Sequence, residues 1–380
     1  MKKISDIFFF ALSISALQLI RSPVESCVNA LDNTSHSGSY AIVVGGATAA
    51  DPDWAAVVDV LQMRYNGQVF VYEGTNLWDV QSALSEYAPK YIGFVARPSD
   101  IISYGGEQYV RNVHQLARAL DGDPYGDAIW GIITGYNADD AMRIATGPSG
   151  ILVSNALLKT ADSWLEYFKQ GHYFSESEYK KMWIKYPDGT IDKSQHGPTD
   201  CSDALVTLLN GNTFDIMVTS GHASQHDWQL HYPFPGLEGF FRSSAGQLYG
   251  EPYSGPNIDI TSTNPKIYYA PGNCLIGHIS DMNCMALAWI HTGGAYQYCG
   301  YTVGTWYGYM GWGISEYFFH VQDRFSFAES FYLNSQALVF DLENHTPGTD
   351  PGGLNYDRDV VAFYGDPACE ARLERSRDPL

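Results

Sequence analysis

Short apolar runs separated by amphipathic stretches recur along the first third of this 380-residue chain. The runs with the pattern of buried strands are 40–44, 68–72, 91–95 and 128–133. Helical periodicity lies between them, over 54–63, 77–87 and 108–120. Alternation of strands and helices predicts an α/β fold, with a mostly parallel sheet flanked by helices.

A second alternating block follows residue 136. We expect 139–170 to be helical and 173–199 to be a polar, irregular surface excursion. After these, the pattern predicts helices at 203–209, 281–291, 314–321 and 327–342, and strands at 214–219, 267–270 and 296–303. The sequence therefore predicts two adjoining subdomains, an N-terminal one over 40–136 and a second over 137–370, followed by a polar tail, 371–380.

Two of the expected strands have a chemically capable side chain just beyond their end. The run 214–219 leads to Gly221-His222, and the run 267–270 leads through Pro-Gly-Asn to Cys274. Parallel strands place ligands at their carboxyl ends, so neighbouring strands would bring His222 and Cys274 to one edge. A thiol beside an imidazole is the minimal equipment for nucleophilic acyl transfer. The pattern predicts a cysteine-type hydrolase.

Composition and charge limit the kinds of molecule that this protein is expected to bind. Apolar residues make up 45% and charged residues 17% of the chain, as in a globular protein. The formal charge of −20 argues against nucleic acid and anionic membranes, because phosphate binding needs a basic surface. A protein or peptide substrate, including a basic one, is compatible with this charge.

The N-terminus has the features of a secretory signal peptide. Two lysines precede the apolar run 7–20, which is short for a membrane span. We expect a signal peptide over 1–26, a polar leader over 27–39, and a secreted or cell-envelope protein. Cys27 weakly resembles a lipoprotein anchoring site. No later stretch is apolar enough to predict a transmembrane segment.

Several stretches, taken in order, resemble the gingipain-like members of the caspase–gingipain group of cysteine peptidases. Besides the two segments ending at His222 and Cys274, they are the Asp-Gly-Asp block 120–131, the stretch 325–338 and the Tyr-Gly-Asp-Pro motif 364–367. The resemblance covers about Tyr40 to Cys369 and implies a caspase/gingipain-like fold, with its catalytic subdomain over 137–370. Two positions depart from the group's pattern: Asn273, where relatives carry a small residue, and Ile132, where gingipains carry a basic one.

The resemblance implies a role for each catalytic residue. Cys274 would attack the scissile carbonyl, and His222 would protonate the leaving amine. The backbone N–H groups of Gly221 and Cys274 would form the oxyanion hole. Asp127 occupies the position of a family acid thought to orient the histidine. No metal or cofactor is required for this chemistry, although the family allows structural calcium.

Substrate contacts are expected on both sides of the cut bond. Trp306 and Tyr307 lie in an aromatic, glycine-rich stretch that would line a cleft beyond the catalytic strand. A gap-free comparison with gingipains places Asp140 near the pocket for the residue before the cut bond, where a carboxylate would select Arg or Lys. The other interpretation is that Asp139 and Asp140 cap the helix 141–145.

Two alternative functions use the same chain differently. His222, His226 and His231 could form a zinc-dependent hydrolase, since the first two have the spacing of helical zinc ligands. Against this, no Glu lies between them as in H-E-x-x-H. The second alternative is a catalytically inactive surface or binding module on the gingipain-like scaffold.

Overall fold

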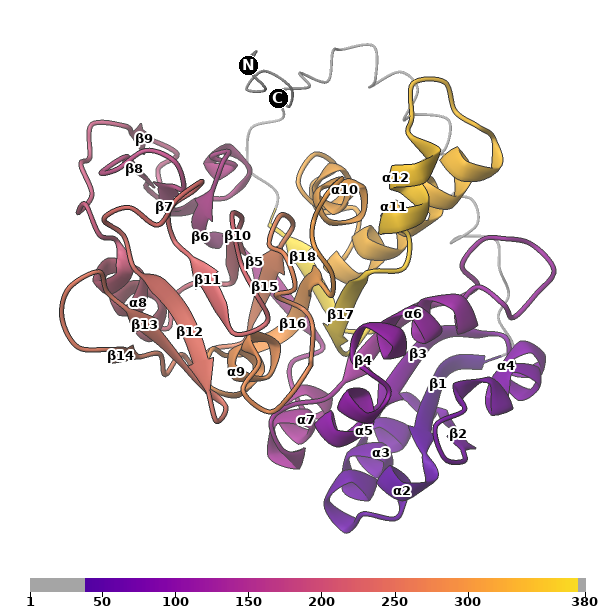
Figure 1. Cartoon of the computed structure of the whole chain (residues 1–380). Coiled ribbons are helices and arrows are strands. Elements are labelled where there is room, and N and C mark those ends of the chain that lie inside the picture. Colours follow the sequence, from indigo (N-terminus) through magenta and orange to yellow (C-terminus); the bar gives the residue numbers. More distant parts are fainter. Residues whose placement is uncertain (1–37, 375–380) are drawn as a thin grey trace, which may run out of the picture. The chain divides into compact units, whose positions relative to one another are not determined.

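The computed structural model describes residues 38–374 (Figure 1), which belong to one compact unit. The expected signal peptide, Cys27 and the end of the polar tail lie outside the described residues. Within 38–374, no helix combines the length and apolarity that crossing a membrane requires.

The fold is built on one twelve-stranded sheet, shown in Figure 1. In spatial order its strands are β2 (Gln68–Tyr72), β1 (Gly38–Gly45), β3 (Pro89–Val95), β4 (Ile129–Ile133), β17 (Val361–Gly365), β16 (Ala295–Tyr301), β15 (Lys266–Ala270), β10 (Ile216–Thr219), β6 (Asn155–Thr160), β7 (Gln170–Ser175), β8 (Met182–Lys185) and β9 (Ile191–Asp192). All neighbours from β2 to β17 are parallel, and so are all neighbours from β16 to β7. The mostly parallel sheet is thus confirmed.

The two parallel blocks run in opposite directions. They meet at β16 and β17, which pair antiparallel with Tyr298 opposite Tyr364. As a consequence, the carboxyl ends of β15 and β10 lie at the same edge of the sheet as the amino end of β4. This reversal decides which side chains can reach His222 and Cys274.

Helices flank the sheet. They are α2 (Gly46–Ala49), α3 (Pro52–Tyr65), α4 (Gln81–Tyr87), α5 (Pro98–Ser103), α6 (Glu107–Leu116), α7 (Ala138–Ala145), α8 (Ser202–Asn210), α9 (Met285–His291), α10 (Tyr309–Phe318), α11 (Phe327–Glu343) and α12 (Pro351–Asp357). Local sequence sets their ends. Asp51 accepts from the N–H of Asp53 to cap α3, which stops at Asn66 in the left-handed region. Ser326 and Glu329 form a capping box that starts α11.

A second, four-stranded antiparallel sheet was not anticipated from the sequence. It consists of β11 (Asp227–Gln229), β12 (Phe240–Ser244), β13 (Gln247–Glu251) and β14 (Ile258–Asp259). Helix α9 contacts both β16 of the large sheet and the strands β12 and β13, so it lies between the two sheets. The small sheet therefore forms a layer beside the part of the large sheet that contains β16.

The expectation for 139–170 is wrong in part. The only α-helix there is α7; it is followed by β5 (Gly150–Val153), which pairs with β18 (Glu370–Leu373), by the buried strand β6 and by a 3₁₀ helix at Leu165–Tyr167. The apolar runs 151–153 and 156–158 are too short to show a period, so they fit a strand and a helix equally well, and here strands form. The stretch 173–199 is also more regular than expected, since it contains the end of β7 and the strands β8 and β9.

The strand β17 joins the two expected subdomains into one sheet. It comes from the far end of the sequence and inserts between β4 and β16. The Tyr-Gly-Asp-Pro motif follows directly: the buried Asp366 carboxylate accepts from the hydroxyls of Tyr40 (3.0 Å) and Tyr65 (2.5 Å). The motif thereby fastens the C-terminal strand to the first strand of the chain.

Candidate active site

His222 and Cys274 lie at one edge of the large sheet, on adjacent parallel strands. β10 and β15 pair in the register Val218 opposite Tyr269, and extending this register places His222 level with Asn273. Both side chains follow the carboxyl end of a buried strand, where parallel sheets leave room for ligands. The structure brings these two sequence-predicted residues to neighbouring loops.

Asn273 ties the two loops together. Its side-chain oxygen accepts from the hydroxyl of Thr219 (2.8 Å), and its side-chain nitrogen donates to the carbonyl of Gly221 (3.1 Å). The Asn273 side chain is fully buried. One amide therefore fixes the residue before the cysteine to the residue before the histidine. The contact gives a structural role to Asn273, the position at which the sequence departs from the gingipain-like pattern.

Further contacts hold the loops farther out. The imidazole Nε2 of His226 lies 2.7 Å from a carboxylate oxygen of Asp281, and the N–H of Met285 donates to the carbonyl of Gln225 (2.7 Å). Each contact joins the loop that carries His222 to the loop that carries Cys274. Noncovalent contacts at three places, Asn273, His226–Asp281 and Met285–Gln225, therefore hold the two loops together.

The backbone around Cys274 is unusual in two ways. Leu275 has φ = 57°, in the left-handed region that non-glycine residues rarely adopt. Such strain concentrates at functional sites. The N–H of Thr305 donates to the Cys274 sulfur at 3.2 Å. An N–H pointing at the sulfur stabilises a thiolate, the nucleophilic form of cysteine.

The Pro271-Gly272 turn before the catalytic loop has a packing reason. The indole of Trp312 lies so close to Gly272 that a Cβ there would be 2.8 Å from it, and a Cβ on Gly311 would be 2.2 Å from the carbonyl of Pro271. Helix α10 therefore packs directly onto the turn. The close approach supports the Cys274 loop and requires glycine at both contact points, Gly272 and Gly311.

Aromatic side chains stand on both sides of the pair. The imidazole of His222 is exposed, and its ring centroid lies 4.9 Å from that of Tyr232. On the cysteine side, Trp306 is 75% exposed and Tyr307 47% exposed, directly after Thr305. Their place beside the cysteine is compatible with the expected cleft wall, which stays a prediction, as does the oxyanion role of Gly221 and Cys274.

The structure does not bring Asp127 to His222. Asp127 precedes β4, and β17, β16 and β15 separate β4 from β10 in the sheet, a spacing of about 19 Å. Its carboxylate instead accepts from the N–H of Leu120 (2.8 Å). Burial, with the nearby Asp121 and Asp123 carboxylates, raises the pKa of Asp127 to about 7. The expected orienting contact is therefore wrong, because the strand order sets the two residues apart.

Asp140 is also misplaced for substrate binding. It lies in the first turn of α7, beyond the carboxyl end of β4, and therefore at the opposite edge of the sheet from Cys274. Its buried carboxylate accepts from the N–H of Tyr136 (2.9 Å) and lies 2.9 Å from Nδ1 of His291. The pocket interpretation is wrong. Asp139 and Asp140 do lie in the first turn of α7, but the residue that caps the helix is Asn137, whose side chain accepts from the N–H of Asp140.

Two other carboxylates lie at the edge that carries His222. β6 pairs with β10 in the register Lys159 opposite Thr219, and its extension places the exposed Asp162 level with His222. Glu176, buried at the end of β7, accepts from the hydroxyl of Ser220, and burial raises its pKa. Sequence reasoning missed both because it assigned this region to a helix and a loop.

The histidines of the zinc alternative do not converge. His226 pairs with Asp281, whereas His231 stacks on Tyr179 with ring centroids 4.0 Å apart. Among residues 38–374, no group of three or more His, Cys, Asp or Glu side chains has the geometry of a metal site. The zinc-hydrolase interpretation is therefore wrong for this cluster, because its ligands point to separate partners.

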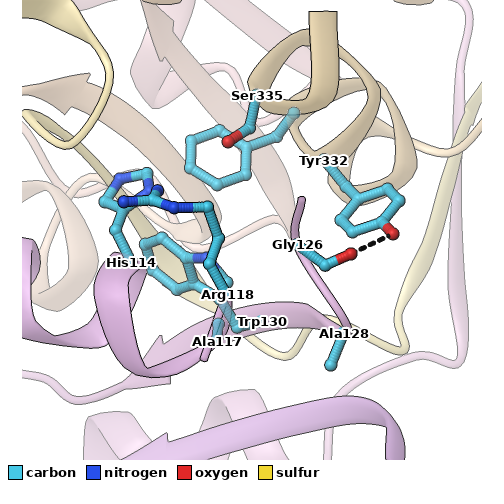
Figure 2. Close-up of a pocket in the computed structure, with 9 residues that line it drawn as sticks. His114, Ala117, Arg118, Gly126, Ala128, Trp130, Tyr332 and Ser335 are labelled. Atoms are coloured by element: carbon cyan, nitrogen blue, oxygen red, sulfur yellow. Dashed lines mark hydrogen bonds between the residues drawn. The ribbon is translucent and has the colours of Figure 1, made fainter. Parts of the chain in front are cut away.

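A small pocket lies elsewhere, between α6, β4 and α11 (Figure 2). Its lining residues are His114, Ala117, Arg118, Gly126, Ala128, Trp130, Phe331, Tyr332 and Ser335. The Tyr332 hydroxyl donates to the carbonyl of Gly126 (2.6 Å), and Arg118 is engaged by Asp359 at 2.6 and 2.9 Å. With its polar groups engaged in this way, the pocket belongs to the packing of α11 onto β4.

Replacing Asn273 by Ala should slow catalysis more than it lowers stability. Losing the tie between Thr219 and Gly221 frees the two loops, and misplacement of about 1 Å costs on the order of 10²-fold in rate. We expect kcat for peptide cleavage to fall by about that factor while KM changes little. Asn273→Asp keeps the acceptor for Thr219 but sets a carboxylate oxygen against the carbonyl of Gly221, so it should lose about as much. A kcat for Asn273→Ala within about twofold of wild type would contradict the role.

Comparisons with known proteins bear on the fold. A scan against protein-family models gave no match, and a search of curated proteins gave none either. Among solved structures, a chain described as "Structure of Protease" is similar, with a TM-score of 0.50 and 13% sequence identity. The similarity covers 89% of this chain and 79% of that one. At this identity the likeness concerns the fold, and the fold of this chain is protease-like.

Proposed function

We propose that this chain is a cysteine endopeptidase of the gingipain-like type, with Cys274 as nucleophile and His222 as general acid and base. The observation that carries the proposal is the tie through Asn273, which holds the two loops together at one sheet edge. The similarity in fold to a protein described as a protease supports hydrolysis of peptide bonds. Export rests on the segment 1–26, which lies outside the described residues.

The proposed reaction proceeds through an acyl-enzyme. The Cys274 thiolate, stabilised by the N–H of Thr305, attacks the scissile carbonyl carbon. The oxyanion that forms accepts from the N–H groups of Gly221 and Cys274. The carbon–nitrogen bond breaks as His222 protonates the leaving amine. His222 then takes a proton from water, whose oxygen attacks the thioester and releases the acid and the thiolate.

The charge of the site bears on the substrate. The exposed Asp162 follows β6, the strand that pairs with β10, and the formal charge of the chain is −20. Negative potential at a cleft raises the local concentration of cationic partners and repels anionic ones. We propose that the enzyme acts on neutral or basic polypeptides. A strict choice of Arg or Lys has no support from Asp140, which lies at the other edge.

The proposal is tested by labelling the folded protein with a peptidyl chloromethyl ketone. Within 38–374, the other cysteines (Cys201, Cys284, Cys299 and Cys369) are buried, and burial raises their thiol pKa values. With Cys27 replaced by Ser throughout, we expect one label, on Cys274, located by peptide mass mapping. Labelling should slow sharply in His222→Ala.

The same experiment separates the inactive-module alternative. In a catalytically inactive protein, Cys274 would still react with iodoacetamide. The peptidyl chloromethyl ketone would then label Cys274 no faster than iodoacetamide does. Rapid peptidyl labelling of a different cysteine, or a rate independent of His222, would overturn the assignment.

A further inference from the structure

The loop between β11 and β12, residues 230–239, displays three exposed apolar side chains, of which Tyr232 contacts His222. Tyr232 is 41% exposed, Phe234 74% and Leu237 49%. Single exposed apolar side chains are common on protein surfaces. Three within six residues, next to a candidate catalytic group, form a local apolar surface instead.

The loop is fastened from beneath. The Tyr179 hydroxyl accepts from the N–H of Leu237 (3.1 Å), and the Tyr179 ring stacks on His231. The N–H of Tyr232 donates to the carbonyl of Glu176 (2.7 Å). Glu238 is buried and accepts from the ammonium of Lys159 (2.7 Å). The exposed side chains therefore stand on a backbone held at several points, which lowers the entropy lost when they bind a partner.

Gly236 makes this arrangement possible. Its φ is 57°, and a Cβ there would overlap the Tyr179 hydroxyl at 1.7 Å. The turn lets the phenol reach the loop backbone at Leu237, while the side chains of Phe234 and Leu237 stay exposed. The exposure of these two side chains is thus built into the turn.

The contact between Tyr232 and His222 indicates on which side of the cut bond the loop lies. The Tyr232 ring centroid is 4.9 Å from that of His222, the group that would protonate the leaving amine. Trp306, by contrast, follows Thr305, whose N–H donates to the Cys274 sulfur. The two aromatic groups therefore flank different reacting groups: Trp306 the nucleophile, and Tyr232 the proton donor.

We infer that Tyr232, Phe234 and Leu237 form a binding subsite for large apolar side chains carboxyl-terminal to the cut bond. The inference rests on the proposed function, because that chemistry makes the His222 side the leaving-group side. Apolar side chains gain from contact with this surface because both partners release water. The subsite makes the enzyme selective for residues after the cut bond. Substrates that carry peptide residues only before the cut bond do not contain them.

The test measures binding of the leaving half directly. Two pentapeptide amides with free amino termini differ only at their first two residues, Phe-Leu or Ser-Ser, and their affinities are measured by isothermal titration calorimetry. We expect the apolar peptide to bind wild type about tenfold more tightly, the low end for apolar discrimination. In Phe234→Ser/Leu237→Ser the ratio should fall to about one, because only exposed side chains are removed.

A control fixes the interpretation. Met63→Ser, which removes a similarly exposed apolar residue on α3, should keep the tenfold ratio. Equal affinity of the two peptides for wild type, or a ratio that survives in the double variant, overturns the subsite. A parallel assay for Cys274-dependent cleavage judges the proposed function: selective binding without cleavage keeps the apolar subsite and refutes the peptidase.

Discussion

Cys274→Ala should abolish peptide hydrolysis, with kcat falling about 10⁴-fold or more. Removing a nucleophile that acts with its base as a unit eliminates the covalent pathway and leaves only binding and oxyanion stabilisation. The half-exposed thiol makes one hydrogen bond, from the N–H of Thr305, so the fold should be unaffected. Cleavage of a quenched peptide library measures the loss, and circular dichroism verifies the fold.

A matched control exists within the chain. Cys369→Ala removes a buried thiol directly before β18 and should leave kcat near wild type. His222→Ala should lose about 10²- to 10⁴-fold in kcat, the usual contribution of a general acid and base. Cleavage that survives in Cys274→Ala would refute the nucleophile.

Glu238→Gln should destabilise the protein by about 3–5 kcal/mol, because it leaves a buried ammonium without its counter-charge. Lys159 and Glu238 are 1% and 2% exposed and lie 2.7 Å apart. In the variant, Lys159 would keep its hydrogen bond to the carbonyl of Ser175 (2.7 Å) but no carboxylate. Urea unfolding measures the change in the free energy of unfolding.

The control is a surface pair of the same length. Arg111 and Glu107 also lie 2.7 Å apart but are 25% and 38% exposed, so Glu107→Gln should cost about 1 kcal/mol or less. Replacing both buried partners, as in Lys159→Met/Glu238→Met, should recover much of the stability. A cost for Glu238→Gln no greater than that for Glu107→Gln would show that the buried charge is solvated by other means.

The sequence predicted the elements with clear periodicity well. β2 has the expected bounds, and β10 and β15 end where the apolar runs end, which placed His222 and Cys274 at a sheet edge. The sequence could not show that β6 is a strand, because its apolar run, 156–158, is too short to have a period that distinguishes strand from helix. Because β6 was not predicted as a strand, the position of Asp162, the acidic residue after it, was not predicted either.

The errors at Asp127 and Asp140 have one physical cause. Both depend on how β4 is oriented and how far it lies from β10, and these follow from the antiparallel pairing of β16 with β17. That pairing joins segments more than sixty residues apart, so no local pattern contains it. The role of Asn273 was hidden for the same reason, since its partners Thr219 and Gly221 are distant in sequence.

The insertion of β17 has a consequence for synthesis. Until residues 361–365 have left the ribosome, β4 and β16 are both open edges, and unpaired edges invite association with other chains. Among residues 38–374, both edges therefore stay unpaired until the last strand of the large sheet has been made. We expect truncation before residue 361 to yield aggregates rather than a shorter folded protein, which size-exclusion chromatography would detect.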